Sequence, residues 1–194
     1  METIIKKATL NDLKYIESLS KTETKSIGFI PKVRYEAAII GQRVHEKTQP
    51  KCNDTIYLCF ENDDPVGFVL GSKGKGVDGF SKVSQIVIQP DARLIERGKL
   101  LLNGIITHYE SMGIFDFRCG CADDLESNFF WKAMGWDKIA QRKGIAYTNT
   151  YKETSDRDIN IYIFTSPNNP QLRLFGNHTV KEAETEIPIP ERDK

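Results

Sequence analysis

The 194-residue sequence has no net charge, because 27 lysine and arginine residues are balanced by 27 aspartate and glutamate residues. A protein that grips nucleic acid through its phosphates usually has a basic excess, so the composition disfavours a nucleic-acid partner. The sequence also has no apolar run near the roughly 20 residues that a membrane-spanning helix needs. Its first residues do not resemble a secretory signal peptide. We therefore expect no membrane association and a cytoplasmic location.

Cysteine and histidine are scarce, with four and three residues respectively. Four cysteines do not form a disulfide framework in a chain of this length, and Cys119 and Cys121 are spaced to share one face of a strand. No histidine is nearby to complete a metal site, so we predict packed, reduced thiols and no bound metal. No serine or cysteine has a convincing histidine partner, which leaves a hydrolase triad unsupported. The glycine-rich stretch 71–76 lacks the spacing of a P-loop.

The composition is otherwise that of an ordinary globular protein, with 39% hydrophobic and 28% charged residues. A chain of this length is typical of one domain. The composition changes after Phe175, where charges alternate and two prolines occur in Ile187-Pro-Ile-Pro190. We therefore predict a single domain over residues 1–175 and a weakly ordered tail over residues 176–194.

Hydrophobic periodicity predicts alternating strands and helices along the chain. The expected helices begin at Asn11 and at Pro31, the second ending at Gly41, and two more cover residues 94–112 and 125–134. Residues 71–79 hold four glycines and are expected to form a loop. The expected strands cover residues 3–8, 55–60, 66–71, 83–88, 114–121, 136–140 and 159–164. This order indicates an α/β (α+β) domain in which helices cover a mixed sheet.

The segment from Ile86 to Leu102 combines a strand, a proline and the start of a long helix. Pro90 ends the strand, and Arg93, Arg97 and Lys99 surround Gly98 at the beginning of the helix. The N-terminus of a helix presents free backbone N–H groups and the positive end of its dipole, which together bind phosphate groups. Arginine and lysine side chains at this point would add charge for a phosphorylated ligand.

A second segment, from Phe117 to Trp136, combines a strand, an acidic turn and a short aromatic helix. Asp123 and Asp124 are placed to cap that helix, which carries Phe130 and Trp131 and ends at Gly135. The aromatic side chains are suited to a core, and equally to the wall of a slot for an extended ligand.

Together these two segments resemble the GNAT (Gcn5-related N-acetyltransferase) superfamily. Its members have an arginine or glutamine, two glycines and a leucine pair after the strand, then a Phe-Tyr and a Gly-Phe further on. Here Arg93, Gly98 and Leu101–Leu102 match the first pattern. Gly98 is the second of its two glycines, and Glu96 stands in the position of the first. Trp131 stands where the family usually has tyrosine. The resemblance covers about residues 4–164.

The resemblance implies a GNAT fold, with a twisted, mostly antiparallel sheet of six to seven strands and about four helices. It also implies that an acetyl-CoA donor lies between two splayed strands, residues 83–88 and 117–121, with no metal taking part. An amine acceptor, either a small molecule or a peptide, would arrive from the opposite side, near residues 26–31. Members often form dimers, which makes a homodimer possible. The residues expected to bind the coenzyme are Ile86, Val87, Ile88, Arg93, Arg97, Gly98, Lys99, Asn128 and Trp131.

The resemblance does not by itself fix the catalytic groups. Glu36 and Asp124 are candidate bases, although surface solvation of Glu36 and helix capping by Asp124 are the favoured interpretations. Gln85 could orient a water molecule or the acceptor, or be an inward-facing side chain bound by backbone. Indole cannot act as the acid that protonates the thiolate, so the candidates for that role are Tyr147, Tyr151 and Tyr162.

Three functions remain open at this point. The first is an active N-acetyltransferase, supported by both segments. The second is a GNAT-fold binding or inhibitory module without turnover, supported by Glu96 and Trp131. The third is an acyltransferase acting on nucleic acid or aminoacyl-tRNA, against which the balanced charge counts; an electropositive acceptor cleft would favour it.

Overall fold

The computed structural model describes residues 2–43, 51–74, 79–93, 95–147 and 152–170. Its centre is one seven-stranded sheet in the order β1-β2-β3-β4-β5-β7-β6. All neighbouring strands are antiparallel except β4 and β5, which are parallel. The strands are β1 (Thr3–Lys7), β2 (Asp54–Glu61), β3 (Asp64–Lys73), β4 (Phe80–Ile88), β5 (Asp116–Ala122), β6 (Asp137–Tyr147) and β7 (Lys152–Thr165).

Five α-helices and two single-turn 3-10 helices occur in the described part of the chain. The short α2 is the helix that the sequence did not predict. The predicted fold class, a mixed and mostly antiparallel sheet flanked by helices, is confirmed. The helices are η1 (Leu10–Asp12), α1 (Leu13–Thr22), α2 (Thr24–Ile27), α3 (Lys32–Ile40), η2 (Pro90–Ala92), α4 (Ile95–Glu110) and α5 (Ser127–Ala133).

Local chemistry explains most of the element ends. At the first helical turn Thr9 and Asp12 form a capping box, in which the Asp12 carboxylate accepts hydrogen bonds from the Thr9 backbone and hydroxyl. Gly41 ends α3 in the left-handed conformation, with φ of 79°. Two expectations were wrong. Strand β3 continues to Lys73, so the loop starts later than Gly71, and α5 starts at Ser127, so Asp123 and Asp124 do not cap it.

The hairpin of β6 and β7 is longer than predicted. The sequence indicated strands only over residues 136–140 and 159–164, whereas β6 reaches Tyr147 and β7 begins at Lys152. The intervening residues are mostly polar or charged, so they lack the apolar alternation by which a half-buried strand is recognised. Cross-strand hydrogen bonding of the backbone nevertheless continues through them.

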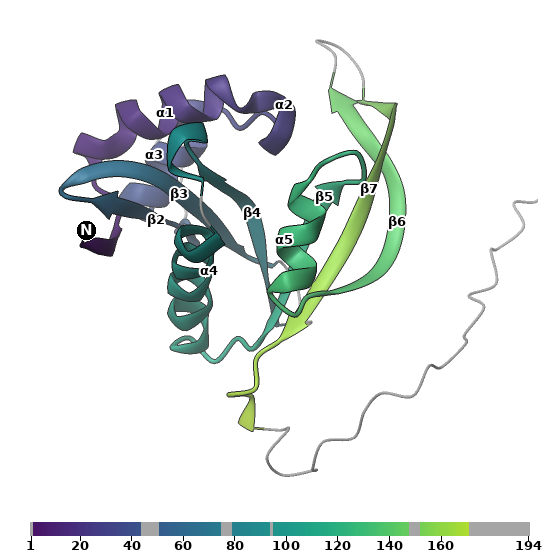
Figure 1. The fold of residues 1–194 in the computed structure, drawn as a ribbon. Helices are drawn as coiled ribbons and strands as arrows, with labels where there is room; N and C mark the ends of the chain where they lie inside the picture. The colour runs from purple at the N-terminus through teal and green to yellow at the C-terminus, as the bar shows by residue number, and fades with distance from the viewer. Residues whose placement is uncertain (1, 44–50, 75–78, 94, 148–151, 171–194) are drawn as a thin grey trace, which may run out of the picture.

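The two faces of the sheet are covered differently (Figure 1). Helices α4 and α5 lie on one face, where a single apolar core joins residues from β2, β3, β4, β5 and β7. Helices α1, α2 and α3 lie on the other face, where the core takes residues from β2, β3 and β4 but none from β5, β6 or β7. The second face of the β5-β7-β6 portion therefore has no helix packed on it among the described residues.

No helix among the described residues combines the length and the apolar character needed to span a membrane. The predicted tail over residues 176–194 lies outside the described residues, so the domain boundary stays a prediction.

Candidate functional site

A split in the sheet creates the site. Strands β4 and β5 pair from Phe80 with Asp116 as far as Val83 with Cys119. Beyond this point β4 continues to Ile88 paired only with β3, and β5 continues to Ala122 paired only with β7. The facing edges of the two strands therefore carry backbone N–H and C=O groups that are not used by a neighbouring strand.

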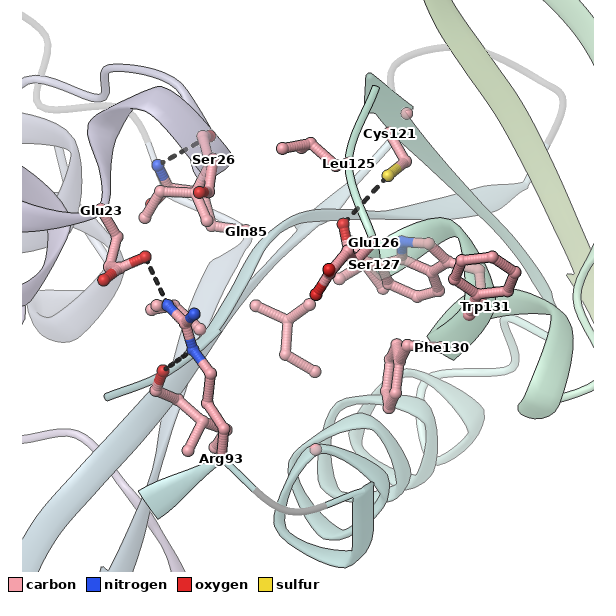
Figure 2. Close-up of a pocket in the computed structure, with 18 of the residues that line it drawn as sticks. Glu23, Ser26, Gln85, Arg93, Cys121, Leu125, Glu126, Ser127, Phe130 and Trp131 are labelled. Carbon is pink, nitrogen blue, oxygen red and sulfur yellow. Dashed lines mark hydrogen bonds and ion pairs between the residues drawn. The ribbon is translucent and has the colours of Figure 1, made fainter. Parts of the chain in front are cut away.

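A cleft of about 680 Å³ occupies this split. Its apolar wall includes Ile86, Leu125, Phe130 and Trp131, and Figure 2 shows the last three side chains grouped on one side of the gap. The cleft is lined both by α4 and α5 residues, on one face of the sheet, and by Ser26 and Ile27 of α2, on the other. It therefore passes through the sheet from one face to the other.

One end of the cleft lies beside the first turn of α4. Arg93 lines it, and its guanidinium donates hydrogen bonds to the Glu23 carboxylate at 2.6 Å and to the Ile88 carbonyl at 3.2 Å (Figure 2). Gly98 also lines the cleft, and a Cβ at this position would lie 2.9 Å from the Phe130 ring. A side chain at position 98 would therefore displace the Phe130 ring, which forms part of the cleft wall.

The other charged residues of this region are placed differently from the sequence-based expectation. Arg97 forms an ion pair with Glu61 and donates a hydrogen bond to the Ala92 carbonyl at 2.5 Å, so its guanidinium is bound within the fold. Lys99 lines a separate cavity of about 200 Å³ between α4 and α5. Glu96 is exposed and is not one of the cleft residues, so its carboxylate does not face the ligand space.

Gln85 is buried and fully hydrogen-bonded. Its Oε1 accepts a hydrogen bond from the Tyr35 hydroxyl at 2.7 Å, and its Nε2 donates to the carbonyls of Ile27 and Gly28 at 3.3 and 3.0 Å. Ser20 and Tyr35 share a further hydrogen bond at 2.6 Å. Gln85 lines the cleft, but these partners match the interpretation of an inward-facing side chain. It anchors the segment after α2 to β4.

Asn128 holds the turn after β5 together. Its amide donates to the carbonyls of Ala122 and Leu125 at 2.8 and 2.7 Å, and to that of Asp123 at 3.2 Å. Its oxygen accepts hydrogen bonds from Asn160 and Tyr162, each at 2.9 Å. Asn128 is absent from the cleft lining, so its polar atoms serve the wall of the cleft rather than its interior.

Trp131 lies in the wall of the cleft. It is buried and packs edge-on against Phe130, with ring centroids 5.3 Å apart. Cys121 lies next to it in the cleft wall, where its sulfur is 3.2 Å from the Ser127 hydroxyl (Figure 2). Burial raises the pKa of Cys121, against smaller opposing effects of hydrogen bonds from Ser127 and Trp131. The thiol is thus a wall group rather than a thiolate nucleophile.

Of the three tyrosines considered as acids, Tyr162 is the one whose side chain is described, and it does not line the cleft. The hydroxyl of Tyr162 is buried and donates to Asn128, and burial raises its pKa. The Tyr147 side chain and the whole of Tyr151 lie outside the described residues. No tyrosine lines the cleft among the residues that the structure describes.

The two candidate bases differ in their position relative to the cleft. Glu36 is on α3 and does not line the cleft. Asp124 does line it, and its carboxylate accepts a hydrogen bond at 2.8 Å from Arg157 of β7. Arg157 also donates to the Lys25 carbonyl at 2.7 Å. This arginine therefore links the hairpin, the turn before α5 and the end of α2 at one side of the cleft.

Sequence reasoning missed two carboxylates that line the cleft, Glu23 and Glu126. Glu23 is paired with Arg93, whereas Glu126 has no ion pair or side-chain hydrogen bond among the described residues (Figure 2). Glu126 lies just before α5, at the position that caps the helix. The acidic turn 123–126 was the available signal, but sequence alone does not tell which of its carboxylates faces inward.

Comparison with solved structures identifies the fold. An acetyltransferase of the GNAT family from Streptococcus pneumoniae superposes with a TM-score of 0.62 at 16% identity, over 84% of this chain and 99% of that one. Arabidopsis thaliana NAA60 in complex with a bisubstrate analogue gives 0.66 at 11% identity, over 86% and 99%. The ribosomal-protein-S18-alanine N-acetyltransferase of Escherichia coli gives 0.60 at 13%, over 84% and 94%.

The chain has the GNAT fold. A scan against protein-family models finds no match, and neither does a search of curated proteins. The fold is thus recognisable in the geometry at sequence identities that are too low to transfer a function. The strands predicted over residues 83–88 and 117–121 belong to β4 and β5, which diverge as expected for this fold. The aromatic helix α5 forms one wall of the cleft between them.

Proposed function

We propose that this protein is an acyl-CoA-dependent N-acyltransferase that transfers an acetyl group to a primary amine. The observation that carries the proposal is the divergence of β4 and β5 after Val83 and Cys119, with a cleft that passes between them. The GNAT neighbours named above are acetyltransferases, which supports the same class of reaction. The acceptor is not identified by this observation.

The residues present fit an acyl-CoA donor. The pantetheine arm is an extended chain with two amides, which suits the unpaired backbone edge of β4 at Ile86, Val87 and Ile88. The apolar wall around Trp131 suits its methylene groups. The first turn of α4 and Arg93 offer backbone dipoles and one guanidinium to the phosphates, provided that Arg93 exchanges Glu23 for the ligand.

The chemistry needs little from the protein beyond positioning and proton transfer. A bound thioester supplies the acyl group: a C–N bond forms to the amine, the C–S bond breaks, the amine loses a proton and the departing thiolate gains one. Glu126 is the described cleft carboxylate that is free of a partner, so we assign it the amine proton, directly or through a water. Backbone N–H groups on the edge of β4 are available to polarise the carbonyl.

Calorimetric titration of acetyl-CoA into the full-length protein, with free coenzyme A as reference, is the direct test. We expect micromolar binding of both. Gly98→Leu should abolish it by filling the cleft beside Phe130, whereas Gly104→Ala, a glycine of α4 outside the cleft, should not. Circular dichroism would check that both variants fold. If acetyl-CoA does not bind the unaltered protein, the proposal is wrong.

One observation favours a second candidate, a GNAT-fold binding module without turnover. No tyrosine lines the cleft among the described residues, and Trp131 occupies the position where the family usually has its acid. Thiol release from acetyl-CoA in the presence of a panel of amines and peptides separates the two. Tight binding without thiol release would support the module.

A further inference from the structure

The face of the sheet opposite α4 and α5 carries an unneutralised basic cluster. Lys82 of β4 lies directly beside Arg118 of β5, and Arg142 of β6 projects from the same face. No carboxylate of the described chain lies within ion-pair distance of these three side chains. Like charges at facing positions of neighbouring strands destabilise a sheet, so this arrangement opposes the fold. Such local conflicts are found mainly where a site needs them.

The mutual repulsion is visible at Lys82. Loss of water around the ammonium group lowers the pKa of Lys82, and the guanidinium groups of Arg34 and Arg142 lower it further. Arg34 is itself compensated, with its Nε 2.9 Å from the Asp54 carboxylate. Arg118 is placed over the Phe80 ring, 4.2 Å from the centroid, which orients it without cancelling its charge. A bound anion would relieve this repulsion.

A stripe of isoleucines lies between the basic residues. Ile163, Ile161 and Ile159 of β7 stand opposite Arg118, Gly120 and Ala122 of β5, and are only partly buried. The side chains of Ile159 and Ile161 fold over Gly120, where an added Cβ would lie 3.1 Å from Ile159. This apolar surface runs along the strand from Arg118 toward Arg142, whose partner on β7 is Ile159.

The surface adjoins the cleft where β4 and β5 separate. Gly120 and Val83 line the cleft, and they are next to the isoleucine stripe and to Lys82 respectively. We propose that this face binds an extended acidic peptide segment of the acceptor, with its carboxylates on Lys82, Arg118 and Arg142 and its apolar side chains on the isoleucines. The inference rests on the proposed function, because it places the acceptor at the acetyl-transfer cleft.

Two features favour a peptide over RNA as the occupant. Three separated cations are few for gripping a phosphate backbone, whose binding grows with the number of contacts. The isoleucine stripe offers apolar contact but no aromatic surface on which bases could stack. Two acidic residues share this face near Arg118: Asp116 precedes it by two residues on β5, and Asp137 of β6 pairs with Ile163, the β7 partner of Arg118. Asp116 accepts a hydrogen bond from Thr165, and neither acid forms an ion pair with the three basic side chains in the described part of the chain.

The test is fluorescence anisotropy of the full-length protein with three labelled probes: a decapeptide of alternating glutamate and isoleucine, its counterpart with glutamine for glutamate, and a ten-nucleotide single-stranded RNA. We expect the acidic peptide to bind at least tenfold more tightly than the glutamine peptide. The double variant Arg118→Glu with Arg142→Glu should remove that advantage, and so should Arg118→Glu alone in part, whereas Lys14→Glu, a charge reversal on α1 that matches the single variant, should retain it.

Several outcomes would overturn the inference. The first is equal affinity for the acidic peptide and the glutamine peptide. The second is a loss of the acidic peptide's advantage in the Lys14 variant as large as in the double variant. The third is preferential binding of the RNA that the double variant abolishes. The chain's own acidic segment is a further competitor, so a gain in peptide affinity when Glu182, Glu184 and Glu186 are changed to glutamine would also count against an external occupant. Calorimetry with acetyl-CoA on the same variants separates the two proposals, because donor binding without peptide selectivity refutes only this one.

Discussion

The two faces of the sheet use the same backbone in different ways. On the α4 and α5 face, one apolar core extends from Cys59 of β2 to Tyr162 of β7. On the other face, the core of α1 and α3 residues stops at Val87 of β4. Beyond that strand the sheet is held from one side only. One half of this face therefore serves stability, and the other half is left free for a ligand beside the cleft.

The largest expected effect is on the free energy of unfolding, when isoleucine is replaced by alanine once in the covered half of this face and once in the uncovered half. Ile56 of β2 is 1% exposed beneath α1 and α3, so Ile56→Ala leaves a cavity and should lower the free energy of unfolding by about 2–5 kcal/mol. Ile161 of β7 lies on the uncovered face, so Ile161→Ala should cost no more than about 1 kcal/mol. Urea unfolding with unchanged m-values measures both.

Equal losses for the two variants would mean that both halves of this face are packed alike. The distinction between covered and uncovered halves would then fail, and the proposed peptide surface with it. A loss at Ile161 that grows in the presence of the acidic decapeptide would sharpen the comparison instead, because a peptide that contacts Ile161 stabilises the unaltered protein more than the variant.

The second effect concerns the cleft, where the two faces meet. Glu126→Gln keeps the size of the side chain but removes its basicity, so kcat should fall about a hundredfold while KM for acetyl-CoA changes by less than about twofold. Steady-state thiol release measures both constants. Glu2→Gln, an exposed change in the same residue type, should leave kcat as it is. An unaltered kcat in Glu126→Gln would assign the proton to another group.

A third variant probes how the covered half supports the cleft. Tyr35→Phe removes the hydroxyl that bonds Ser20 and Gln85 in a buried position, which should destabilise the fold by about 1–3 kcal/mol. Tyr57→Phe is the matched control, because its hydroxyl is only partly buried and lies 3.4 Å from His108. The control should lose less than about 0.5 kcal/mol. If the two variants lose the same amount in urea unfolding, the buried network contributes no special stability.

How far the sequence predicts this protein depends on whether a feature is local. The strand before Pro90, the helix with Leu101 and the aromatic helix with Trp131 follow from short-range pattern, and all three occur. The partners of Arg97 and Asn128 do not, because Glu61 and Tyr162 meet them only after the chain has folded. The sequence motifs therefore indicate the strands that border the cleft, but they do not indicate which of the nearby charged side chains line it.

The uncovered face was not predictable for a related reason. Periodicity reports which residues alternate along a strand, and it does not report whether a helix covers the polar side. The basic residues Lys82, Arg118 and Arg142 lie on three different strands. They do not give the sequence a basic excess, because its net charge is zero. Only the register of β4, β5, β7 and β6 brings them to one surface.

The smallest expected effect lies on the covered face and depends on pH. Burial lowers the pKa of His108 on α4 below its usual 6.5, and Lys7 lowers it further. Below about pH 6.5 the unfolded chain therefore takes up a proton before the folded protein does, and stability falls until the folded-state pKa is passed. His108→Gln should reduce the loss of Tm between pH 7.5 and 5.5, measured by differential scanning calorimetry. An equal loss in both proteins would show that His108 is as well hydrated in the folded state as in the unfolded one, and that α4 covers this part of the sheet less closely than its contacts with Tyr57 indicate.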